Sequence, residues 1–136
     1  MTLVSAATTS STITVANYNH YNDSLYVNSS RGYTLSEIIK PDVTAPGVNV
    51  YGPISGGRYG TRTGSSVSAA HAAGAAAILL QWGLLDAVII NMDGNDVRRL
   101  LIQGASQKEG ILFPDRGWGY GTINLQNTFE TLRIVR

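Results

Sequence analysis

The sequence predicts an α/β domain built around one central, buried helix. Short β-branched segments alternate with helical segments along the 136 residues, a layout typical of a sheet covered by helices. Nearly every residue of the segment 67–82 is Ala, Val, Ile, Leu or Gly, and a helix that is apolar on all sides must be buried on all sides. Hydrophobic residues make up 43% of the chain and charged residues 14%, which argues against disorder.

Strands are predicted where β-branched residues lie between turn signals. These places are residues 13–18, 25–27, 48–51 and 58–61. The step Ala45-Pro46-Gly47 predicts a turn into the third of them, and the pair Gly56-Gly57 predicts the turn before the fourth. That fourth strand should deliver the chain to Gly64, at the start of the central helix.

Helices are predicted from apolar periodicity and from capping residues. The expected ranges are residues 66–82, 95–104 and 125–132. Gly83 is a fitting C-cap for the first helix. The second helix should be capped by Asn95 or Asp93 and should stop at Gly104. The segment 110–121 contains Pro114 and several glycines, and it predicts a loop with a short hairpin.

Ser66 stands at the predicted N-terminus of the central helix. There the unpaired backbone N–H groups and the positive end of the helix dipole favour a developing oxyanion, as a nucleophilic serine requires. A tight turn from strand to helix needs a residue without Cβ, which Gly64 supplies. A serine at this position can equally be a simple N-cap. The residues of this turn alone leave both interpretations open.

Two segments together resemble the nucleophile region of subtilisin-like serine peptidases, the subtilases or peptidase S8 family. They are KPDVTAPGVNV at residues 40–50 and GSSVSAAHAAG at residues 64–74. On the family's motif, Ser66 takes the position of the nucleophile. Ser65 replaces the usual Thr and Ala70 replaces the usual Pro. The first change keeps a hydroxyl and the second removes only a restraint on φ, so neither abolishes the chemistry.

Four further segments match the family in its order along the chain. They are ITVANYN (13–19), SSRG (29–32), NDVRRLLIQGA (95–105) and GWGYGTINLQNTF (117–129). The amino-acid sequence of the nucleophile helix is similar to that of clostridial and gut-bacterial Csp-type subtilases. The resemblance implies a three-layer αβα domain with a parallel sheet and an endopeptidase that acts on peptides or proteins. It also implies that the backbone N–H of Ser66 serves the oxyanion hole, and that the bacterial parent protein is extracellular or associated with the spore or cell envelope.

The other catalytic residues of the family are missing from these 136 residues. The subtilase order is Asp, His, Ser, and neither a D-x-G strand nor an H-G-T-H helix precedes Ser66; the Asn of the oxyanion hole is also expected upstream. His20 lies in a polar loop, and His71 lies about 140° around the helix from Ser66. We therefore expect residues 1–136 to be the C-terminal part of a catalytic domain, inactive alone. A non-catalytic pseudoprotease, or a binding or scaffold fragment, is the alternative.

The remaining candidates favour structural roles. Asp42 follows the proline turn of KPDV and is predicted to be structural rather than a catalytic acid. The cluster Asp93, Asn95 and Asp96 lacks the spacing of a calcium loop, and helix capping explains it better. No metal or other cofactor is expected.

Charge and composition limit the partners. The net charge is +1 and the chain has no cysteine. The arginines, Arg98 and Arg99 among them, are scattered as on a solvated face, so no nucleic-acid partner is expected. No run of residues is expected to reach the length of a membrane span. The apolar helix and unpaired strand edges predict that the fragment self-associates.

Overall fold

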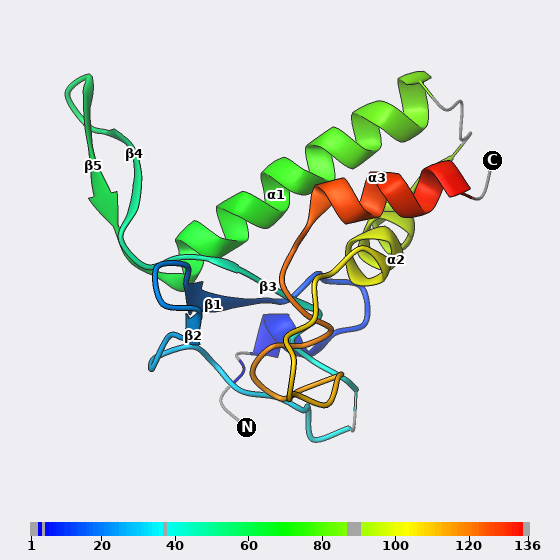
Figure 1. The fold of residues 1–136 in the computed structure, drawn as a ribbon, viewed down its shortest axis with the longest axis horizontal. Helices are drawn as coiled ribbons and strands as arrows, with labels where there is room; N and C mark the ends of the chain where they lie inside the picture. Colours follow the sequence, from blue (N-terminus) through cyan, green and yellow to red (C-terminus); the bar gives the residue numbers. More distant parts are fainter. Residues whose placement is uncertain (1–2, 4, 37, 87–90, 135–136) are drawn as a thin grey trace.

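A small sheet packed against one long helix forms the centre of the computed structural model, which describes residues 3, 5–36, 38–86 and 91–134 (Figure 1). The sheet has the strand order β2-β1-β3. Its strands are β1 (Val15–Asn19), β2 (Ser24–Leu25) and β3 (Val43–Pro46). The helices are α1 (Ser65–Gln81), α2 (Gly94–Gln103) and α3 (Leu125–Ile134), with a short 3-10 helix at Ser5–Thr8.

The sheet combines one parallel and one antiparallel pair of strands. β1 runs parallel to β3, with Val15 opposite Val43, and antiparallel to β2, with Tyr18 opposite Leu25. The predicted strands at 13–18 and 25–27 are therefore confirmed with shifted ends. β3 was not predicted, because the turn signal of Pro46-Gly47 masked the short β-branched run before it. Its backbone also pairs with the closing segment, where Ile123 N–H donates to the Thr44 carbonyl at 2.9 Å.

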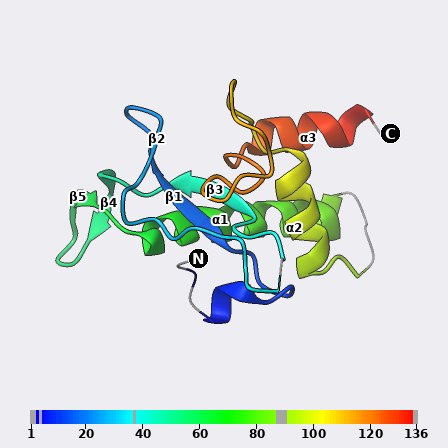
Figure 2. The ribbon, with the colours of Figure 1, turned by 90° about the horizontal axis from the view of Figure 1, so that it is seen from below.

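Helix α1 buries only one face. It runs along one side of the β1 and β3 pair (Figure 2). Its buried residues recur at the helical period along that face: Ser68, Ala72, Ala75 and Leu79. The opposite face is exposed at Ala73, Ala77 and Ile78, so the predicted burial on all sides is wrong for this chain. The elements that the structure describes pack against one side of α1 and leave the other open.

Gly83 does not end the helix, contrary to the prediction. The chain continues from α1 into a π-helical turn over Trp82–Asp86, and Trp82 keeps the right-handed helical conformation. Gly83 is buried, and a Cβ there would overlap the sulfur of Met92. The glycine is thus required by close packing against Met92, which lies two residues before α2.

By length and composition, the helical stretch Ser65–Leu85 is long and apolar enough to cross a membrane, and its most apolar 18 residues have a mean hydropathy of 1.3. The expectation that no run reaches this length is therefore wrong. The core helix of a globular domain has the same length and composition. Here one face of the stretch packs on β1 and β3, while the apolar residues of its other face are exposed.

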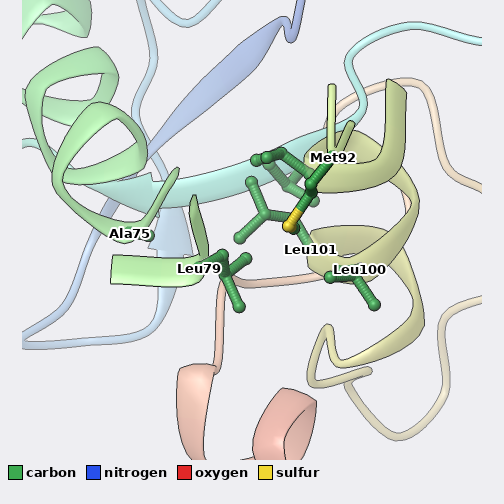
Figure 3. Close-up of a cluster of buried hydrophobic side chains, with 7 residues drawn as sticks. Ala75, Leu79, Met92, Leu100 and Leu101 are labelled. Carbon is green, nitrogen blue, oxygen red and sulfur yellow. The ribbon is translucent and has the colours of Figure 1, made fainter. Parts of the chain in front are cut away.

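The main apolar core lies between α1 and α2. Ala75 and Leu79 of α1 meet Leu100 and Leu101 of α2, with Met92 beside them (Figure 3). α2 begins at the N-cap Asp93, whose side chain accepts from Asn95 N–H and Asp96 N–H, and it ends at Gly104. The predicted helix is confirmed with its ends shifted by one residue, and of the two predicted caps, Asn95 and Asp93, the structure has Asp93. The predicted closing helix is also confirmed, with two further residues at its end.

The strands β4 (Val50–Ile54) and β5 (Arg58–Arg62) form a hairpin that projects from the body beside the start of α1 (Figure 1). Gly56 and Gly57 form its turn with φ of 81° and 68°, values that favour glycine. The predicted strand at 58–61 and its turn are confirmed, while the strand predicted at 48–51 begins two residues later. The hairpin predicted within 110–121 is present as a bridge between Asp115 and Gly119.

Candidate active site

Ser66 lies in the first turn of α1 with its side chain exposed. The N-cap is Gly64, and no side-chain hydrogen bond caps the helix. The interpretation of Ser66 as a capping serine is therefore wrong. As the second residue of the helix, Ser66 carries a backbone N–H without an intrahelical acceptor. Hydroxyl and N–H thus stand together at the positive end of the helix dipole, where both are available to a ligand.

The turn before Ser66 is held by the carbonyl oxygen of Gly47. This oxygen accepts a hydrogen bond from Gly64 N–H at 2.8 Å and from Asn17 Nδ2 at 3.4 Å. Gly47 N–H in turn donates to Tyr18 O at 3.1 Å, which joins the segment to β1. The turn before Ser66 is therefore hydrogen-bonded to the central sheet through Gly47.

Ser68 anchors the same turn from the helix side. Its buried hydroxyl donates to the Ala45 carbonyl of β3 at 3.0 Å. A Cβ at Gly47 would overlap both Ser68 Oγ and Asn17 Oδ1, so glycine is required there by close approach of side chains. The helix start and the sheet are in direct contact at this point.

Asn17 and Ser68 were not predicted to be parts of the site. Asn17 is fully buried, and its backbone N–H donates to Ser29 Oγ at 3.0 Å. Its Oδ1 is buried and has no hydrogen-bond partner among the described residues. A polar residue within a buried β-branched strand was the available signal for Asn17. The available signal for Ser68 was its position in the sequence, which places it on the same helix face as the apolar residues Ala72 and Leu79.

Neither histidine is placed to act as a base for Ser66. Nδ1 of His71 lies 3.0 Å from the Val67 carbonyl, and the ring is exposed. The ring of His20 lies against Tyr21, with centroids 4.1 Å apart. Ser66 Oγ has no hydrogen-bond partner in the part of the chain that the structure describes.

Asp42 is the centre of a buried ion cluster, as its predicted structural role requires. Its carboxylate lies 2.7 Å from Lys40 Nζ and 2.6 Å from Arg98 Nε, and it accepts from Thr14 N–H at 2.7 Å. Lys40 and Asp42 are fully buried. The cluster joins β1, the start of β3 and α2. The expectation of a solvated Arg98 is therefore wrong, whereas Arg99 is exposed and pairs with Asp96.

Asp93 is a capping residue, as predicted. The backbone N–H groups of Asp96 and Asn95 hold the pKa of the Asp93 carboxyl below its usual value, because hydrogen bonds to a carboxylate favour its charged form. Within the described residues, no group of three His, Cys, Asp or Glu side chains lies close enough to hold a metal ion.

Two cavities flank the first turns of α1. One of about 310 Å³ lies between the β4 and β5 hairpin and the helix start, and Ser66 lines it. The other, of about 670 Å³, lies between α1 and the closing segment. Its lining is largely apolar and includes Ala70, Gly74, Ile78 and Leu125. The second cavity opens on the exposed face of α1.

Comparison with known proteins gives a consistent result. A family model described as the subtilase family matches residues 2–121. Pyrolysin of Pyrococcus furiosus is 28% identical over 114 residues, covering 79% of this chain and 8% of the relative. The minor extracellular protease Vpr of Bacillus subtilis is 28% identical over 120 residues, covering 79% of this chain and 14% of the relative.

Solved structures agree with the sequence comparisons. The structure of the Clostridium perfringens CspB protease matches with a TM-score of 0.91 and 34% identity, covering 99% of this chain and 29% of that one. The self-cleaved protease domain of PatA, at 24% identity and a TM-score of 0.73, shows the shared fold; it covers 95% of this chain and 44% of that one. The predicted subtilisin-like α/β fold is confirmed. The chain spans less than a third of the CspB protease and of both curated relatives.

Proposed function

The chain belongs to the subtilase family, and on this basis we propose that it is the C-terminal part of the catalytic domain of a serine endopeptidase. The observation that carries the proposal is the placement of Ser66. Its hydroxyl is exposed at the N-terminus of α1, on a turn that Gly47 and Ser68 hold against the sheet. We call the longer protein that supplies the preceding residues the parent protein.

Ser66 acts in this proposal as the nucleophile. Its Oγ attacks the scissile carbonyl of a peptide, and a histidine from the preceding residues of the parent protein takes the proton. The negative charge moves to the carbonyl oxygen, where the backbone N–H of Ser66 donates to it. An asparagine from the preceding residues supplies the second donor. Collapse of the tetrahedral intermediate expels the amine, which receives the proton from the histidine.

The isolated chain should be inactive, because a serine without its base is a poor nucleophile. Removal of the base from a triad typically lowers turnover by several orders of magnitude. Ser66 Oγ has no such partner among the described residues. This chain therefore contributes the nucleophile and part of the oxyanion hole.

The test is intact-mass analysis after incubation with a fluorophosphonate probe. The parent protein should gain one adduct, the parent protein with Ser66→Ala should gain none, and the isolated chain should stay unlabelled. Ser65→Ala is the matched control, because Ser65 is also exposed in the first turn and should leave labelling intact. A parent protein that folds but never labels would instead be a pseudoprotease or a binding protein.

Two further properties belong to the proposal. The relative from Bacillus subtilis is named as an extracellular protease, and we place the parent protein outside the cytoplasm, in the medium or at the spore or cell envelope.

We also propose that the isolated chain self-associates. Its α1 carries an exposed apolar face beside the cavity of about 670 Å³, and burial of such surface against a second copy is favourable.

A further inference from the structure

Arg62 stands beside Ser66 in the smaller cavity. It is the last residue of β5 and lies opposite Val50 in the hairpin ladder. The cavity of about 310 Å³ has room for a substrate side chain. Apart from Ser66 and Arg62, the lining residues have small or apolar side chains: Val50, Gly52, Pro53, Gly60, Val67 and Ala70. Arg62 is therefore the charged side chain in the wall of a cavity that adjoins the nucleophile.

Arg62 has no acidic residue near it along the chain and forms no ion pair among the described residues. The segment 43–85 has no Asp or Glu, and its charged residues are Arg58 and Arg62 alone. In the part of the chain that the structure describes, no carboxylate pairs with Arg62. Its hydrogen bond goes from Nη1 to the carbonyl of the adjacent Thr61 at 3.0 Å. The other donors of the guanidinium remain free for a ligand.

We propose that Arg62 determines substrate specificity, and that it selects peptides with an aspartate or glutamate side chain next to the scissile bond. The inference rests on the proposed function of Ser66. A guanidinium matches a carboxylate with two parallel N–H···O bonds, which supply both charge and geometry. The apolar walls of the cavity exclude part of the water around this pair, so the attraction is stronger than between fully exposed groups.

The experiment compares hydrolysis of matched peptides by the parent protein. Peptides with Glu or Asp at each position flanking the scissile bond are paired with peptides that carry Gln or Asn there. At one of these positions, kcat/KM should be about five- to tenfold higher for the acid than for its amide, the range expected of a partly exposed charge-assisted pair. Arg62→Gln should bring this ratio close to one, and Arg62→Lys should keep part of the preference.

Arg58 provides the matched control. It carries the same charge on the same strand but lies at the other end of β5, opposite Ile54, and does not line the cavity. Arg58→Gln should leave the ratio unchanged at low and at high salt. An equal loss in Arg58→Gln would mean that long-range attraction selects the substrate, and the role of Arg62 would be wrong.

Labelling of Ser66 by the fluorophosphonate separates this inference from the proposed function. A parent protein that labels and cleaves, but shows the same ratio for acids and amides, overturns the inference alone. A parent protein that never labels overturns both. An unchanged ratio in Arg62→Gln would also overturn the inference, because the preference would then not depend on Arg62.

Discussion

The backbone N–H of Gly64, the N-cap of α1, donates a hydrogen bond of 2.8 Å to the carbonyl oxygen of Gly47. This bond ties the turn that presents Ser66 to the segment after β3. The same carbonyl accepts from the buried Asn17 side chain. The position of the proposed nucleophile thus depends on contacts between three segments that are distant in the sequence.

Gly47→Ala in the parent protein should lower both stability and Ser66 labelling. The new Cβ would overlap Ser68 Oγ and Asn17 Oδ1, and such overpacking typically costs about 1–3 kcal/mol in the free energy of unfolding. Chemical denaturation and the rate of fluorophosphonate labelling measure the two effects. Gly94→Ala is the control, because a Cβ there meets nothing within 4 Å. Equal stability of the two variants would contradict the close packing at Gly47.

Replacing Ser68 or Ser65 by alanine should have different effects on the free energy of unfolding. Ser68→Ala leaves the buried Ala45 carbonyl without its donor, and should lower the free energy of unfolding by about 1–3 kcal/mol. Ser65→Ala removes an exposed hydroxyl that makes no capping bond, and should leave stability unchanged. Denaturant titration of both variants of the parent protein provides the comparison. If Ser65→Ala proved the more damaging change, the anchoring role of Ser68 would have to be abandoned.

Arg98 and Arg99 are adjacent residues with different predicted effects. Arg98 pairs with the fully buried Asp42, while Arg99 forms an exposed pair with Asp96. Arg98→Gln should cost about 1–3 kcal/mol, as expected for loss of a hydrogen bond to a buried charged group. Arg99→Gln should cost less than about 0.5 kcal/mol. Unfolding of the two variants in the parent protein tests this difference, and similar costs would show that the Asp42 cluster contributes little.

The isolated chain should sediment as oligomers at tens of micromolar, through the apolar face of α1. Ile78 is 49% exposed and lines the larger cavity, so Ile78→Gln should shift the distribution toward the monomer. Leu112→Gln is the control, because Leu112 is 93% exposed but does not line that cavity. Analytical ultracentrifugation distinguishes the outcomes. A monomeric wild-type chain, or an equal effect of both changes, would refute association through α1.

Asp93 should make the stability of the parent protein depend on acidic pH. Its folded-state pKa lies below the ordinary value of 3.8, so the carboxylate stabilises α2 fully above that value, and the effect is lost as pH falls through the folded pKa. Asp93→Asn keeps a capping oxygen but has no charge. The difference in Tm between wild type and Asp93→Asn should therefore shrink from about pH 7 to about pH 3. A difference that stays constant or grows over this range would contradict the role of the charge.

Local patterns predicted the elements whose cause lies within a few residues. The end of α2 at Gly104 and the turn at Gly56-Gly57 were identified correctly, and the cap Asp93 was one of the two residues predicted for that position. Each depends on side-chain hydrogen bonds or φ preferences that act within one turn of the chain. The motifs around Ser66 also identified the family, because they lie in one order along most of the chain.

Long-range contacts could not be predicted in the same way. Gly83 looked like a helix terminator, but its buried position against Met92 requires the absence of a Cβ. Arg98 looked solvated, yet it pairs with Asp42 across the fold. The sequence offers no local sign of these partners, since their approach depends on how α2 and the residues before it pack against α1 and the segment that leads into β3.

The sequence by itself determined that a serine follows a glycine turn at the start of an apolar helix, and that this helix belongs to a subtilase. Only the tertiary structure decided that α1 is buried on one face, that Asn17 and Ser68 support the turn, and that Arg62 enters the cavity beside Ser66. The physical reason is the distance along the sequence over which the deciding interactions act. Backbone geometry follows from neighbouring residues, whereas burial and pairing depend on which distant segments the fold brings together.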